Sequence, residues 1–147
     1  MKKYINISLA YALCAMAGGV FYREFTKWMG FSGTTALGKV HVHLFVLGMA
    51  MFLMVALFAQ RTDLEQEKRF RVFLVVYNLG TPLTAVMLLV RGILQVLGVA
   101  LPNGVDAAVS GIAGVGHILT GAGLILLLLA LRKVCAKGPQ AASLERA

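Results

Sequence analysis

The sequence predicts an all-α integral membrane protein, a four-helix bundle with both termini in the cytoplasm. Hydrophobic residues make up 59% of its 147 residues, whereas a soluble domain has about 45–50%. Charged residues make up only 14%, whereas about 25% is usual. Four apolar runs also have about the 20 residues that a helix needs to cross a bilayer. Little chain is left for a soluble core, so we expect one transmembrane domain over residues 1–137.

The four predicted helices are joined by short polar segments. The first run covers residues 4–22 and the second covers residues 38–59. The third, residues 72–99, is long enough to cross at a tilt, and we expect Pro82 to kink it. The fourth covers residues 107–131, and residues 138–147 form a polar tail that we expect to be mobile.

The first run also has features of a signal peptide. Lys2 and Lys3 precede it, and Ala15 and Ala17 have the spacing of a cleavage site. We interpret it as a retained spanning helix.

The distribution of Lys and Arg predicts the orientation of the helices. If the chain crosses four times, ten basic residues lie on the side of the termini and four on the other side. Basic residues accumulate on the cytoplasmic side of membrane proteins. The ten are Lys2, Lys3, Arg61, Lys68, Arg69, Arg71, Arg132, Lys133, Lys137 and Arg146. We therefore expect residues 23–37 and 100–106 to be extracytoplasmic.

The composition also argues against several classes of function. The net charge of +8 would suggest nucleic acid in a soluble protein, but here the basic residues lie at the ends of apolar runs. Cys14 and Cys135 lie far apart and form no CxxC motif. No nucleophile–base arrangement or phosphate loop is present, so we do not expect this chain to be an enzyme on its own.

The few polar residues in or beside the spans are the candidate functional residues. His41 and His43 lie near the start of the second run, and His117 lies about three turns into the fourth. Arg91 lies near the end of the third, and Tyr22, Arg23 and Glu24 close the first. All fall in the extracytoplasmic part of the predicted bundle. Because ionisable groups in a bilayer are costly unless paired or liganded, this layer suggests a site.

Histidines on facing helices are the usual axial ligands of a b-type haem. His41 and His43 point about 200° apart on a helix, so only one of them can meet His117 across the bundle. The distance from the helix start favours His43 as the partner of His117. His43 lies about 8 Å and His117 about 15 Å from the starts of their helices, and His41 lies still nearer the start than His43. The face shared with Gly48 favours His41 instead. Both choices remain open at this point.

Glycines and basic residues near the histidines suggest how a haem would be held. Gly114 and four other glycines in the fourth run let a flat macrocycle or a neighbouring helix approach closely, and Gly48 would do so on the second helix. Arg91 and Arg23 could bind haem propionates, since Arg forms bidentate contacts with carboxylates. The structural alternative is that Arg91 pairs with Glu24 or Asp106.

Two other functions are compatible with the same residues. In a quinone or lipid-headgroup site, the histidines, Arg91 and Glu24 would bind carbonyl or phosphate oxygens. In a structural subunit of a larger complex, the polar layer would only join helices. The partners that we expect are the lipid bilayer, a redox or respiratory membrane protein, and further copies of this chain. We do not expect nucleic acid to be a partner.

Several segments resemble known proteins. Residues 22–25 (YREF), 40–49, 91–93 and 111–117 (GIAGVGH) are similar to a small bacterial family of four-helix membrane proteins of unknown function. This implies the fold and a place in the bacterial cytoplasmic membrane. The His41–His43 pattern followed by Gly48 also resembles the second helix of the haem-copper oxidase superfamily and of nitric-oxide-response haem-copper membrane proteins. That resemblance implies that a histidine here ligates haem.

Overall fold

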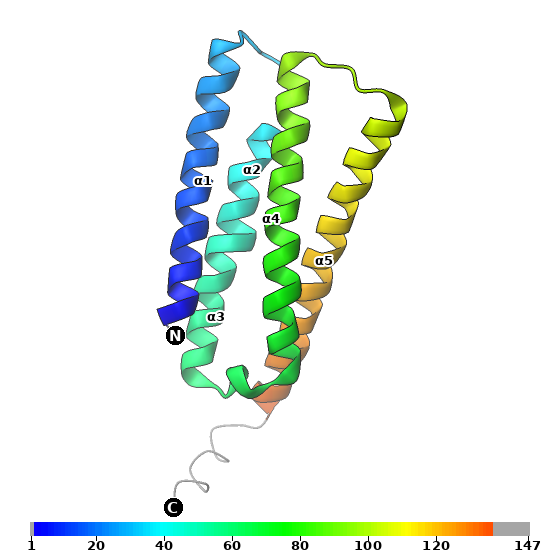
Figure 1. Cartoon of the computed structure of the whole chain (residues 1–147). Coiled ribbons are helices and arrows are strands. Elements are labelled where there is room, and N and C mark those ends of the chain that lie inside the picture. Colours follow the sequence, from blue (N-terminus) through cyan, green and yellow to red (C-terminus); the bar gives the residue numbers. More distant parts are fainter. Residues whose placement is uncertain (1, 137–147) are drawn as a thin grey trace, which may run out of the picture.

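The computed structural model describes residues 2–136, and all its regular structure is helical (Figure 1). The elements are α1 (Lys2–Trp28), α2 (Leu37–His43), η1 (Leu44–Ala50), α3 (Met51–Arg61), η2 (Leu64–Gln66), α4 (Lys68–Leu97) and α5 (Asn103–Ala136). The expected mobile tail at residues 138–147 lies outside the described part of the chain.

Four helical segments are long and apolar enough to cross a membrane, as predicted. They are α1, the continuous stretch Leu37–Arg61, α4 and α5. Large apolar side chains cover their outer faces, for example Leu13, Leu79 and Ile118. Such a surface requires a lipid environment, because a soluble protein does not expose so much contiguous apolar area.

The four segments run up and down, so α1 begins and α5 ends at the same end of the bundle (Figure 1). Two ion pairs hold this end together. Lys3 of α1 lies 3.1 Å from Glu65 in the α3–α4 connection. Lys133 of α5 lies 2.8 Å from Glu67, which precedes α4. An even number of crossings is thus confirmed, while the side of the membrane stays a prediction.

Glycines on both helices make the α4–α5 interface close. A Cβ on Gly80 of α4 would lie 2.6 Å from the backbone nitrogen of Thr120. A Cβ on Gly116 would lie 2.8 Å from Oγ1 of Thr84. Gly123 packs in the same way against Tyr77. Close backbone approach through small residues is the usual way in which membrane helices gain packing energy.

The second span is not the uniform helix that the sequence predicts. Its middle, η1, is a seven-residue π-helix. A π-helical turn carries one residue more than an α-helical turn and so changes the regular backbone hydrogen bonding. Two buried hydroxyls bond to carbonyls of this segment: Tyr77 donates to Leu47 at 2.7 Å, and Ser8 donates to Met49 at 2.8 Å. In contrast, α4 continues as one helix through Pro82.

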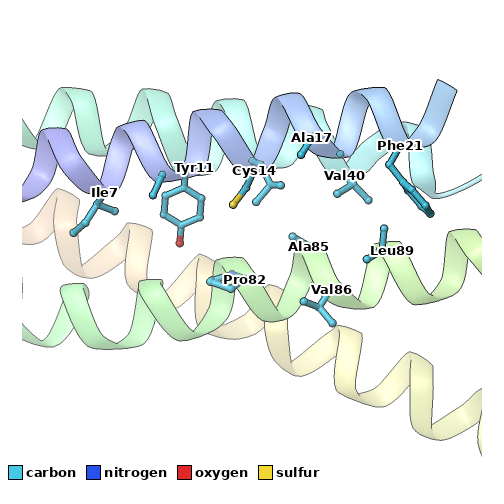
Figure 2. A pocket seen from close by; sticks show the side chains of 13 residues that line it. Ile7, Tyr11, Cys14, Ala17, Phe21, Val40, Pro82, Ala85, Val86 and Leu89 are labelled. Atoms are coloured by element: carbon cyan, nitrogen blue, oxygen red, sulfur yellow. The ribbon is translucent and has the colours of Figure 1, made fainter. Parts of the chain in front are cut away.

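An apolar groove of about 600 Å³ lies between α1 and α4. Figure 2 shows Ile7, Tyr11 and Cys14 of α1 on one side and Pro82 and Ala85 of α4 on the other. None of the histidines lines it. The groove is therefore separate from the polar layer that the sequence singles out.

Candidate functional site

The structure brings His43 of α2 and His117 of α5 together. The centroids of their rings are 6.4 Å apart and the ring planes are inclined at 83°. The two residues are 74 positions apart in the sequence, and they meet because α2 and α5 both pack on α4. Of the two histidines that the sequence left open, His43 is the one that lies beside His117, while ligation of a haem by this pair stays a prediction.

Backbone carbonyls fix the tautomer of both rings. Nδ1 of His43 lies 2.8 Å from the carbonyl oxygen of Lys39, and Nδ1 of His117 lies 2.8 Å from that of Ala113. A carbonyl oxygen only accepts, so Nδ1 must carry the proton. In each neutral ring Nε2 then keeps its lone pair. In histidines that bind a metal through one ring nitrogen, a hydrogen bond from the other ring nitrogen to a carbonyl oxygen fixes the orientation of the ring.

His41 lies on the opposite side of the same helix, against α1. Its ring stacks on that of Tyr22 with centroids 6.4 Å apart, and it covers the bare backbone of Gly19. Its Nδ1 is buried and has no hydrogen-bond partner among residues 2–136. His41 and Tyr22 therefore belong to the α1–α2 contact and not to the His43–His117 pair.

The glycines of α5 fall into two groups. Gly116 and Gly123 pack on α4, whereas Cβ atoms added to Gly111, Gly114 or Gly121 would meet nothing within 4 Å. Gly114 and Gly121 lie three residues before and four after His117, which places them on the same helix face. His117 therefore projects from a bare strip of backbone.

Gly48, in contrast, is filled by packing within the bundle. A Cβ there would lie 2.3 Å from the ring of Tyr11, so the missing side chain makes room for the Tyr11 ring. A cofactor role for Gly48 stays a prediction, and this contact gives it no support.

Arg91 reaches the same face of α5 near the N-terminal end of that helix. It pairs with Asp106, and its guanidinium donates to Oγ of Ser110 at 2.6 Å. Ser110 lies seven residues before His117, about 10 Å along the helix. The structural alternative of an Arg91–Asp106 pair is thus present, and it places a cation two turns from His117.

Arg23 and Glu24 pair with each other at the end of α1. Nε of Arg23 lies 3.6 Å from Oε1 of Glu24, and the Arg23 side chain is 80% exposed. Neither contacts the His43–His117 pair through a hydrogen bond or ion pair. Their expected roles at a cofactor stay predictions.

Ser110 was not among the candidate residues predicted from the sequence. Asp106, Ser110, Gly114, His117 and Gly121 follow one another at spacings of three or four residues. That periodicity marks a single helix face, so the polar and bare stripe on α5 was visible in the sequence. The carbonyl partners of the rings were not, because they depend on rotamers.

Comparison with known proteins identifies one match. A family described as "Protein of unknown function (DUF2871)" matches residues 1–134. No curated protein and no solved structure matches the chain. The resemblance of the second helix to haem-copper proteins stays a prediction.

Proposed function

This chain belongs to the DUF2871 family of proteins of unknown function, and we propose that it is a membrane protein that binds haem b between His43 and His117. The neighbouring pair of imidazoles carries the proposal. Their centroids lie 6.4 Å apart. An ion between two imidazoles forms bonds of about 2 Å to each nitrogen. With about 1 Å more from each nitrogen to its ring centre, the centroids would lie about 6 Å apart.

The number of ligands favours haem over a bare metal ion. No group of three or more His, Cys, Asp or Glu side chains suited to a metal occurs in residues 2–136. A protein zinc site needs three or four protein ligands. A haem iron brings four nitrogens of its own and needs only axial ligands from the protein. Two histidines with free Nε2 atoms are therefore a complete set for haem and an incomplete set for zinc.

The surroundings of His117 suit a flat ligand. The bare strip at Gly114 and Gly121 leaves open space on either side of the ring. Arg91 and Ser110 lie about 10 Å away along α5 and could bind a propionate, with Arg91 shared between that group and Asp106. When bound, haem supplies one-electron redox chemistry. The residues of this chain would hold it and orient both imidazoles.

Absorption spectroscopy of the purified protein tests this proposal. We expect a bis-histidine haem, with a sharp Soret band and resolved α and β bands on reduction. His43→Ala and His117→Ala should each abolish the low-spin spectrum. His41→Ala is the matched control and should keep it, because His41 faces α1. A colourless protein after expression with added haem would refute the proposal.

Quinone is the alternative ligand that the same experiment detects. The apolar groove between α1 and α4 could hold a hydrocarbon tail, but the polar residues expected to bind a quinone headgroup do not line it. A haem-free sample that copurifies with quinone would favour this alternative. A haem held here would serve electron transfer, haem handling or gas sensing.

We further propose that the bundle lies in the bacterial cytoplasmic membrane with both termini in the cytoplasm. The start of α1 and the end of α5 share one end of the bundle with Arg61, Arg69 and Lys133, which agrees with the basic bias of cytoplasmic ends. A membrane-impermeant thiol reagent tests this in intact cells. Cys135 should be protected, and the introduced thiol of the Asn103→Cys variant should react.

A further inference from the structure

The π-helical segment η1 begins immediately after His43 and ends where α3 begins. The direction in which His43 points therefore depends on how far this segment turns. Below η1, α3 faces α5 through Met51, Met54, Val55 and Phe58, which oppose leucines of α5. This face of α3 is the reference from which we count the angular position of each residue of α2 around the helix axis.

An uninterrupted α-helix would not direct His43 to α5. Counted back from α3 at about 100° per residue, the α5-facing side would pass through Leu44 and Val40. His43 would point about 70° to one side of it and His41 about 90° to the other. Neither histidine would then face His117 squarely.

One extra residue in the π-helix changes this phase by about 100°. The same count then places His43 within about 30° of the α5-facing side, and His41 on the opposite side of the helix. This agrees with the contacts, since His43 meets His117 and His41 meets Gly19 and Tyr22 of α1. Leu44 and Val40 line the groove beside α1 and α4.

Two side chains from other helices stabilise the widened turn. Tyr77 of α4 is fully buried and donates to the carbonyl of Leu47, while its ring packs on Gly123 of α5. Ser8 of α1 donates to the carbonyl of Met49. Inside a membrane, main-chain groups outside the regular pattern need such partners.

We propose that η1 sets the rotation of α2 so that His43 faces His117, and that Tyr77 and Ser8 are the positioning residues that hold it. This inference rests on the proposed function for its biological meaning, because the device serves the haem ligand. Its geometry is independent of haem and can be tested in the apo-protein.

Cross-linking measures the rotation directly. In a Cys14→Ser/Cys135→Ser background, His117→Cys is combined in turn with His43→Cys, Leu44→Cys or Val40→Cys. A short bifunctional thiol reagent should link position 43 to position 117 most efficiently. A higher yield for position 44 or 40 would mean that α2 has the α-helical phase, and it would overturn the inference.

The role of the two hydroxyls is tested in the same assay. Tyr77→Phe/Ser8→Ala removes both hydrogen bonds and should lower the yield at position 43 at least fivefold, because each hydrogen bond lost shifts the population by about fivefold. Tyr4→Phe, in the same aromatic cluster, is the matched control and should leave the yield unchanged. An unchanged yield in the double variant, with helix content intact by circular dichroism, would refute the role of Tyr77 and Ser8.

Deletion of Val46 provides the rescue. Val46 is exposed in the middle of η1, and removing one residue should restore an α-helix while keeping the phase of His43. The deletion should restore the 43–117 cross-link in the Tyr77→Phe/Ser8→Ala background. Failure to restore it would contradict the phase argument. A colourless protein with the predicted cross-links would refute haem binding alone and leave the geometric inference standing.

Discussion

Gly114 and Gly116 are two residues apart on α5, yet the structure predicts opposite effects of adding a methyl group. At Gly116 the new Cβ would lie 2.8 Å from Oγ1 and 3.0 Å from the backbone nitrogen of Thr84. At Gly114 it would meet nothing within 4 Å. Both alanine variants gain about 1 kcal/mol of helix propensity. Overpacking at Gly116 costs about 1–3 kcal/mol.

The difference between the two variants isolates the clash. Since the helix propensity cancels, Gly116→Ala should be about 1–3 kcal/mol less stable than Gly114→Ala. Reversible unfolding in mixed detergent and SDS micelles, followed by circular dichroism, measures the free energies of unfolding. Equal stabilities would refute the assignment of Gly116 to the α4–α5 interface.

A larger residue separates packing from ligand binding. Gly114→Leu should keep the stability of the bundle, because the space beside it is open. It should nevertheless weaken haem binding, because its side chain would cover the strip beside His117. A variant with unchanged haem content would contradict the role of this strip as a seat for the macrocycle.

Two further predictions concern the frame of the bundle. The Lys133 ammonium lowers the pKa of Glu67. This ion pair therefore contributes stability above the ordinary Glu pKa of 4.5, and the contribution is lost as the pH falls through the lower folded-state pKa of Glu67. The unfolding free energies of the wild type and Glu67→Gln should converge in acid, and a constant difference down to the lowest pH would count against the pair. Phe52 is fully buried among Tyr11, Phe73 and Tyr77. Phe52→Ala should therefore lower the free energy of unfolding by about 3–5 kcal/mol. Leu53 faces the lipid, so Leu53→Ala is the control and should lower it far less.

Much of the fold could be predicted because it depends on hydropathy and length. The predicted run at residues 72–99 corresponds to α4, Lys68–Leu97, and the run at residues 107–131 lies within α5. The start of α4 and both ends of α5 extend beyond the apolar runs, because polar residues such as Lys68 and Lys133 continue the helix outside the hydrocarbon layer. Gly98, with φ of 64°, ends α4 in the left-handed conformation typical of a helix terminus.

The candidate site could be predicted only in part. The sequence identified a layer with three histidines and Arg91, since each lies at a recognisable depth in an apolar run. It could not separate the packing glycines from the open ones. Gly114 and Gly116 have the same chemistry, and only the position of α4 gives them different surroundings. The same holds for Gly48, which Tyr11 covers from a distant helix.

By itself, the sequence determined that the chain forms four membrane-spanning helices and which ionisable residues lie among them. These are one-dimensional properties, because hydropathy and helical rise add up residue by residue. Only the tertiary structure decided that His43, and not His41, meets His117. That choice depends on rotation about the helix axis, which the π-helix at residues 44–50 shifts by about one residue. Tyr77 and Ser8 donate hydrogen bonds to that segment from other helices, so no pattern within the second span could reveal the shift.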